Sequence, residues 1–432
     1  MAIDRQSILD IWARLGEEGK APGELIYAAE VLPLYTVAID PWIERLVKVY
    51  LQGLSQRSAH FKLVIAPYGG GKTHFLMALG SRALKEGFAV SYIACAEGVS
   101  FENPMDVYRV FMKNLQLPGE EKPGTRSLLR AVINYKYDQI RIRGVPDPEA
   151  ALGMWLKALS QEDYPELALG RVMSEALRAQ LFPDPTVAGE PALRWLRGEI
   201  DTLTKEERES LRLARVAKKD QNELGRNLLL SIIRFLKEEA GAKGVVLLFD
   251  EVETLFSAKG KALQRLLAAI RVMLDQPASV KEGVPLLGLF AAVPDIIDLL
   301  SKYPAVEQRL AVGGASFEEG NDFSPQIHLD KVASQEKLLQ DLGFKLLELG
   351  ELSRAHRFDR NIQKQNIETL AKVASQSSLE IDARRLFVKA CVNILDLQYH
   401  QGERRFLEEE LRDRYRGFFE NLKQKDEQEL EP

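Results

Sequence analysis

A glycine-rich loop between an apolar run and a helical pattern constrains the fold of this chain more than any other feature. Residues 61–66, FKLVIA, form an apolar and partly β-branched run of the kind that makes a buried strand. Residues 73–87, THFLMALGSRALKEG, follow with apolar residues at helical spacing and end at a glycine, a common helix C-cap. The order strand, loop, helix predicts an α/β fold whose loop binds phosphate.

The loop reads APYGGGKT over residues 66–73, whereas the phosphate-binding pattern G-x-x-x-x-G-K-[ST] begins with glycine. Because the first position only has to start the turn, a small alanine can stand there, and a chance glycine turn is the less favoured alternative. In such a loop the lysine reaches the β and γ phosphates and the hydroxyl binds Mg²⁺. We predict that ATP and ADP contact Pro67, Tyr68, Gly69, Gly70, Gly71, Lys72, Thr73 and His74, with Lys72 also catalytic and Thr73 also a magnesium ligand.

A second motif, KGVVLLFDEVETLF at residues 243–256, carries acids at the end of an apolar strand. Ligands of open α/β sheets bind at such carboxyl ends. We predict that Asp250 holds Mg²⁺ through its water shell and that Glu251 orients and deprotonates the attacking water. The alternative is that these acids only solvate the strand end.

The third predicted strand, residues 285–293, ends in Ala292 and Val293, where many ATPases carry a polar residue that senses phosphate. This departure argues against efficient hydrolysis but not against nucleotide binding. Asp295 is expected to cap the next helix. Two arginine positions remain candidates: Arg309, as an arginine finger presented by a neighbouring subunit, and one of the pair Arg384 and Arg385, as a second sensor that folds back over the nucleotide. For both, a surface ion pair is the open alternative.

These motifs resemble the origin-recognition branch of the AAA+ ATPases and, more closely, the ATP-binding proteins of BREX phage-resistance systems of the BrxD type. The resemblance rests on YGGGKTHFLMALGSRALKEGFAVSYI, VVLLFDEVETLF, AAVPDIID followed by YPAVEQRL, and IDARRLF. It implies Walker A residues at Lys72 and Thr73, Walker B residues at Asp250 and Glu251, and finger and sensor roles for Arg309 and Arg384. It also implies ATP and Mg²⁺ as cofactors, a homo-oligomer and other defence-system proteins as partners.

The predicted organisation is an N-terminal helical segment over residues 1–57, a P-loop AAA+ core over 58–330 and a C-terminal helical lid and tail over 331–432. The phosphate loop and the acidic motif lie much farther apart than one or two βα units, so residues of about 97–241 are expected to form an insertion. Its pattern is helical, including residues 103–116, NPMDVYRVFMKNLQ.

The insertion contains a local basic stretch with interleaved tyrosines at 135 and 137. Such a surface attracts phosphate backbones, and tyrosines stack on exposed bases. A plain solvated helix face is an equally good interpretation. The residues predicted to contact DNA are Lys122, Arg126, Arg130, Lys136, Arg141 and Arg143.

Composition excludes several classes of protein. With 432 residues and a net charge of -5, the chain has no global electrostatic attraction to nucleic acid. No stretch approaches a membrane span or the apolar core of a signal peptide, so a cytoplasmic protein that does not contact membranes is expected. Cys95 and Cys391 are expected to be buried free thiols, and the scattered histidines give no metal-ligand spacing.

Three functional hypotheses follow. The first is a DNA-associated AAA+ ATPase in a defence assembly, in which ATP controls oligomerisation or DNA association. The second is a nucleotide-binding scaffold or switch that hydrolyses slowly, which the apolar third-strand end favours. The third is a superfamily 2 helicase, because residues 66–73 also fit A-x-x-G-x-G-K-T. The third is disfavoured because the residues after Leu310 offer only one convincing strand, too few for a second RecA-like domain.

Overall fold

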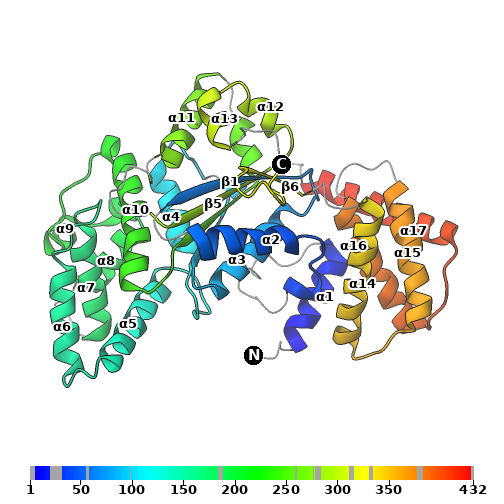
Figure 1. Ribbon diagram of the computed structural model, residues 1–432, viewed down its shortest axis with the longest axis horizontal. Coiled ribbons are helices and arrows are strands. Elements are labelled where there is room, and N and C mark those ends of the chain that lie inside the picture. The colour runs from blue at the N-terminus through cyan, green and yellow to red at the C-terminus, as the bar shows by residue number, and fades with distance from the viewer. Residues whose placement is uncertain are drawn as a thin grey trace. The chain divides into compact units, whose positions relative to one another are not determined.

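The structure is a computed structural model (Figure 1). It describes residues 5–19, 32–54, 58–97, 99–182, 188–257, 260–275, 277, 284–310, 316–329, 334–376 and 383–429. The chain forms two compact units, each built from separate stretches of sequence. The first unit comprises Met1–Glu44, Ile65–Ser81 and His328–Pro432, and the second comprises Arg45–Val64 and Arg82–Ile327. The boundaries proposed from sequence at residues 57 and 330 remain predictions.

A six-stranded sheet forms the centre of the second unit, in the order β3-β2-β4-β5-β1-β6. Strand β4 pairs in parallel with both neighbours, with Ala89 opposite Val245 and Val245 opposite Leu286. All six residues of β4 are buried, which explains the continuous apolar run of its first five. The predicted α/β class is thus confirmed. The strands are β1 (Ala59–Ile65), β2 (Ala89–Ala94), β3 (Leu115–Gln116), β4 (Val245–Asp250), β5 (Leu286–Ala292) and β6 (Gln326–His328).

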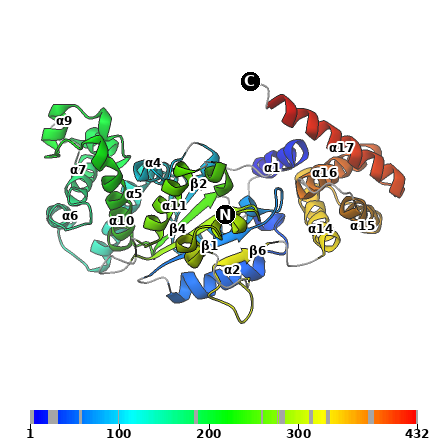
Figure 2. The ribbon, with the colours of Figure 1, turned by 90° about the horizontal axis from the view of Figure 1, so that it is seen from above.

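Helices separate β2 from β4 in the sequence, as predicted, and Figure 2 shows α6, α7 and α9 lying farther from the sheet than α10. Helix α4 packs against both α10 and β2. The prediction of helix through residue 116 is wrong at its end, because Leu115 and Gln116 pair antiparallel with β2. The helices are α4 (Pro104–Asn114), α5 (Thr125–Ile142), α6 (Pro148–Leu159), α7 (Leu169–Leu181), α8 (Gly189–Leu196), α9 (Lys205–Ser210) and α10 (Gln221–Glu239).

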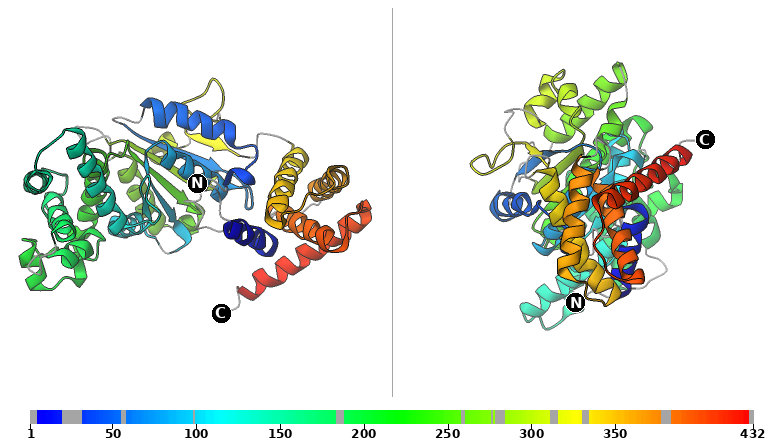
Figure 3. Two further views of the ribbon diagram at one scale, coloured as in Figure 1. Left: turned by 90° about the horizontal axis from the view of Figure 1, so that it is seen from below. Right: turned by 90° about the vertical axis from the view of Figure 1, so that its right-hand side faces the viewer.

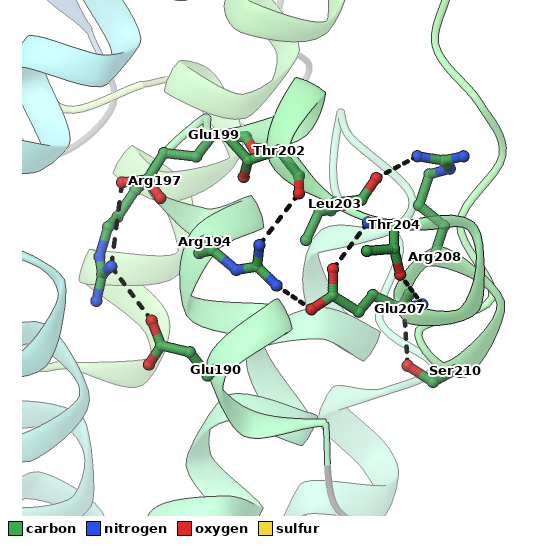
Figure 4. Close-up of polar contacts among 10 residues, drawn as sticks. All are labelled: Glu190, Arg194, Arg197, Glu199, Thr202, Leu203, Thr204, Glu207, Arg208 and Ser210. Carbon is green, nitrogen blue, oxygen red and sulfur yellow. Dashed lines mark hydrogen bonds and ion pairs between the residues drawn. The ribbon is translucent and has the colours of Figure 1, made fainter.

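Polar contacts fix the connection between α8 and α9 (Figure 4). Thr204 and Glu207 form a capping box, in which each side chain accepts a hydrogen bond from the other residue's backbone N–H. Arg194 of α8 donates to the Glu207 carboxylate and to the Thr202 carbonyl. The short helix α9 has no buried residue, so these bonds rather than core packing hold it in place.

Strand β1 carries a lysine that lies in the core. Lys62 is only 1% exposed, and its ammonium donates to the Ser324 carbonyl. The rings of Tyr50 and Phe317 lie 4.4 and 4.6 Å from its Nζ, so two aromatic faces replace part of the lost hydration. Tyr50 belongs to the π-helix η3 (Val47–Leu54), which follows α2 (Asp40–Leu46). Burial lowers the pKa of Lys62 to about 8.

Three helices flank β5 in the sequence: α11 (Lys261–Asp275), α12 (Ile296–Leu300) and α13 (Pro304–Leu310). Asp295 occupies the N-cap position of α12, as predicted, but its side chain makes no capping hydrogen bond. In the described part of the chain, no helix combines the length and apolarity that crossing a membrane requires.

The first unit joins the two ends of the chain (Figure 3). Trp12 of α1 donates to the Asp396 carboxylate at 3.0 Å, and Arg354 binds the same carboxylate through two nitrogens. Cys391 is a buried free thiol in this core, and Cys95 is one in the second unit. The helices are α1 (Arg5–Glu18), α14 (Gln335–Arg354), α15 (Arg360–Gln376), α16 (Ala383–Gln401) and α17 (Glu408–Glu429), together with the short η2 (Leu32–Leu34).

Candidate functional site

Three consecutive glycines shape the loop between β1 and α3 (Lys72–Lys85). Gly69 and Gly71 have φ angles of 65° and 85°, in the left-handed region that glycine adopts without steric cost. A Cβ on Gly70 would lie 2.7 Å from the Ala66 Cβ and 2.8 Å from the Pro67 carbonyl oxygen. The turn therefore admits no side chain at Gly70, and the buried Ala66 fits because it is small.

Lys72 opens α3 and turns back over the loop. Its Nζ donates to the carbonyls of Ala66 and Pro67 at 3.0 and 3.2 Å, and it lies 5.2 Å from the centre of the Tyr68 ring. Tyr68 is 59% exposed, so its ring forms the outer side of the loop. Thr73 is exposed in the first turn of the helix. The positive end of the α3 dipole and a lysine thus meet at one loop, as phosphate binding requires.

Arg384 contacts the same loop from the C-terminal helices. Its Nη1 donates to the Gly70 carbonyl, and it lies 3.1 Å from the position of a Cβ built on Gly71. The neighbouring Arg385 points elsewhere, because its Nε donates to the Glu18 carbonyl of α1 at 2.7 Å. The first unit therefore brings one of the two predicted sensor candidates, Arg384, to the phosphate loop.

His74 connects α3 to the segment after η2. Its Nε2 lies 2.8 Å from the Thr36 hydroxyl, which donates its own proton to the Leu32 carbonyl. The hydroxyl oxygen is therefore the acceptor, and Nε2 carries the proton of a neutral imidazole. The Tyr35 ring lies 5.2 Å from the imidazole. Burial, together with the charge of Arg384, lowers the pKa of His74 to about 4, so this contact does not change between pH 6 and 8.

In the second unit, Asp250 is the last residue of β4 and Glu251 follows it. Hydrogen bonds fix the Asp250 carboxylate and the backbone of Glu251. Asp250 is 1% exposed, and each of its carboxylate oxygens accepts a hydrogen bond. The Tyr92 hydroxyl donates to Oδ2 at 2.8 Å, and the Glu251 N–H donates to Oδ1 at 2.9 Å. Glu251 has a φ of 52°, which is uncommon for a residue with a side chain. Burial and the Asp250 charge raise the pKa of Tyr92, so its phenol remains a donor.

Aromatic packing supports this strand end. The Phe249 ring stacks on Phe290 of β5 with centroids 4.8 Å apart, and Phe101 lies 5.2 Å from Phe249. Such ring pairs stabilise the core beyond the area that they bury. The acids therefore follow a strand end that is packed in the core, although Glu251 itself is exposed.

The family model described as BREX system ATP-binding protein BrxC/D matches residues 32–412. The chain belongs to this BrxC/D family. The match confirms the resemblance inferred from the loop, the acidic strand and the arginine motifs, and it covers all of them. Comparison with curated proteins gives no match.

In this BrxC/D protein, Arg309, the predicted arginine finger, forms an ion pair within its own chain. The Arg309 guanidinium binds the Asp275 carboxylate of α11 through two nitrogens, one of them at 2.8 Å, and also the Ala305 carbonyl. Arg309 and Asp275 are 32% and 42% exposed, so the pair is accessible to solvent. Asp275 and Ala305 also line an open cleft of about 880 Å³ between α10, α11 and α13.

The residues of the predicted basic surface do not all face solvent, because those within α5 lie on different sides of the helix. Residues Arg126, Arg130, Tyr137 and Arg141 are exposed at helical spacing, and Tyr137 is 43% exposed. Lys136 instead turns inward, where its Nζ binds Glu239 at 2.6 Å and lies over the Trp155 ring. Tyr135 packs against Gly241.

Acids neutralise part of this surface, since Arg130 pairs with Glu120 and Arg141 pairs with Asp138. Lys122 and Arg143, at the two ends of α5, are exposed. The interpretation of this BrxC/D insertion as a DNA contact remains a prediction.

Sequence reasoning missed two residues of the candidate site. Tyr92 lies in β2, and the sequence motifs provided no reason to assign it a role. The available signal was a phenol within an otherwise apolar run beside the acidic strand. Thr36 lies in the segment YTVAIDP, for which the family resemblance implies a place beside the adenine pocket but no hydrogen-bonding role for Thr36.

Proposed function

We propose that this BrxC/D protein binds ATP with Mg²⁺ and hydrolyses it within a phage-defence assembly, where nucleotide state controls oligomerisation or DNA association. The observation that carries the proposal is the glycine loop, which Lys72 and Arg384 both contact and in which Gly70 admits no side chain. The family description supports ATP as the ligand.

The residues at the loop fit a nucleotide phosphate chain. The glycine turn leaves room for phosphate oxygens, the α3 N-terminus favours negative charge, and Lys72 supplies a cation from the same loop. Residues from Pro67 to His74 form the binding segment in this proposal. Arg384 stabilises charge on the terminal phosphates from α16.

The magnesium ligands in this proposal are the Thr73 hydroxyl and the Asp250 carboxylate, oxygen donors of the kind that Mg²⁺ prefers. When bound, the ion neutralises charge that develops on the phosphates. Glu251 orients the attacking water and accepts its proton. Arg309 acts on the nucleotide of a neighbouring subunit in a homo-oligomer.

A slowly hydrolysing scaffold is the second candidate. It is favoured by the end of β5, where Ala291 and Ala292 are fully buried and no hydroxyl or amide side chain is available to sense the γ-phosphate. In that case ATP occupancy itself, rather than turnover, controls binding to other defence-system proteins.

The test combines nucleotide binding with turnover, with and without single-stranded and double-stranded DNA, and includes mass measurement under the same nucleotide conditions. We expect Lys72→Ala to abolish ATP binding or hydrolysis, and we expect Glu251→Gln to bind ATP without turning it over. Lys85→Ala, an exposed lysine in the last turn of the same helix, is the matched control and keeps wild-type behaviour. Unchanged turnover in Lys72→Ala contradicts the assignment of the loop, and tight binding with negligible turnover in the wild type favours the scaffold.

A further inference from the structure

We propose that Tyr92 of β2 is a positioning residue whose hydroxyl holds the Asp250 carboxylate in the orientation that serves a magnesium–nucleotide complex. The inference rests on the proposed function, because it requires that Asp250 acts toward Mg²⁺. It adds a residue from a different strand, outside the loop and the acidic motif.

The register of the sheet explains why Tyr92 reaches this carboxylate. Ala94 of β2 lies opposite Asp250, and Tyr92 precedes Ala94 by two residues on the same face of the strand. Its hydroxyl donates to Oδ2 at 2.8 Å. A donor from the adjacent strand therefore fixes the plane of a carboxylate that is almost fully buried, while each oxygen keeps lone pairs for other partners.

The same carboxylate also holds the backbone of Glu251. The Glu251 N–H donates to Oδ1 of Asp250, and the Glu251 carbonyl accepts from the N–H and hydroxyl of Thr254 at 3.0 and 2.7 Å. These bonds keep Glu251 at its positive φ, a conformation that persists only where surrounding contacts enforce it. Tyr92, Asp250 and Glu251 thus form one hydrogen-bonded series.

Strand β2 is itself held along its other edge. The Asn114 side chain donates to the Tyr92 carbonyl at 2.8 Å, and Ser91 pairs with Leu115 of β3. Tyr92 therefore approaches Asp250 from a backbone that is paired on both sides. Partners that orient a metal ligand in this way typically contribute ten-fold to hundred-fold to metal affinity or activity.

The test measures Mg²⁺ affinity separately from turnover. A fluorescent ADP analogue is titrated onto the full chain in EDTA and then at increasing Mg²⁺. We expect Tyr92→Phe to weaken the apparent Mg²⁺ affinity by about ten-fold while the metal-free ADP affinity stays within about two-fold. Tyr399→Phe, at an exposed tyrosine of α16, is the matched control and leaves both values unchanged.

A double-mutant cycle tests the route through Asp250. If Tyr92 acts through this carboxylate, Tyr92→Phe causes no further loss of Mg²⁺ affinity in an Asp250→Asn background. Independent losses in the two variants, or an equal fall in metal-free ADP affinity, overturn the inference. If the wild type shows Mg²⁺-dependent binding and Tyr92→Phe has the same apparent Mg²⁺ affinity, only this inference fails. If the wild type shows no Mg²⁺ dependence, the proposed function fails with it.

Discussion

Arg384 donates a hydrogen bond to the carbonyl of Gly70, a residue 314 positions earlier in the sequence. One end of this contact is a glycine that cannot be replaced without a clash, and the other is the second residue of α16. The C-terminal helices and the phosphate loop are therefore parts of one unit. We therefore expect a nucleotide that binds at this loop to act directly on α16 through this contact.

The first prediction concerns Arg384. Removing its guanidinium in Arg384→Ala takes away a charged hydrogen bond, worth about 1.5–3 kcal/mol, so we expect ATP affinity to fall by about ten-fold to hundred-fold. Arg385→Ala is the matched control, because Arg385 bonds the Glu18 carbonyl instead. ATP-binding isotherms of the two variants check the prediction. Equal losses of ATP affinity would mean that the packing of α16, rather than the Arg384 guanidinium, supports binding.

The second prediction concerns pH and His74. The folded chain keeps this imidazole neutral down to a pKa of about 4, whereas the unfolded chain protonates it near 6.5. Since the unfolded state binds the extra proton, the free energy of unfolding falls as pH drops from 6.5 to 4, by at most about 3 kcal/mol from this group. We expect His74→Gln, which still donates to Thr36, to lose this part of the acid sensitivity.

Urea unfolding of the wild type and His74→Gln between pH 4 and 7.5 gives the comparison. Parallel profiles of unfolding free energy against pH for the two proteins would contradict the assignment of this acid sensitivity to His74. In Arg384→Ala we also expect the pKa of His74 to rise, because a nearby positive charge is removed.

The third prediction concerns Arg309. A partly exposed ion pair such as Arg309–Asp275 is worth about 1 kcal/mol or less, whereas an arginine finger contributes about 10³-fold or more to turnover. The guanidinium is therefore able to leave Asp275 at little cost. We expect Arg309→Ala to reduce turnover by about 10³-fold only in the assembled state, and Asp275→Asn to change it by less than about three-fold. Similar losses in both variants, or a loss in a demonstrated monomer, would rule out action in trans.

The fourth prediction concerns the exposed face of α5. If this face contacts DNA, Arg126→Ala together with Arg143→Ala weakens binding and lowers the slope of log K against log salt by about two. Lys136→Ala is the control, since Lys136 faces Glu239 and Trp155. Electrophoretic or fluorescence-anisotropy titrations with DNA at several salt concentrations measure both the affinity and this slope. An unchanged slope would indicate that the arginines only solvate the helix.

The sequence by itself determined the elements that depend on local pattern. A strand buried on both faces is rich in apolar residues, so the apolar run of residues 245–249 could be recognised without any partner. The glycine loop could also be predicted from the sequence, because positive φ angles and close backbone approach require glycine at fixed spacing. Amphipathic spacing likewise revealed the helices of the insertion.

Only the tertiary structure decided which side chains meet. No local pattern distinguishes Tyr135, packed on Gly241, from the exposed Tyr137, because helix rotation and the neighbouring α10 set their directions. The two-residue strand at Leu115 was hidden because pairing with β2, rather than propensity, makes it a strand. The bonds of Tyr92 to Asp250 and of Arg384 to Gly70 join residues more than 150 positions apart. Such contacts arise from sheet register and helix packing, which are properties of the assembled fold.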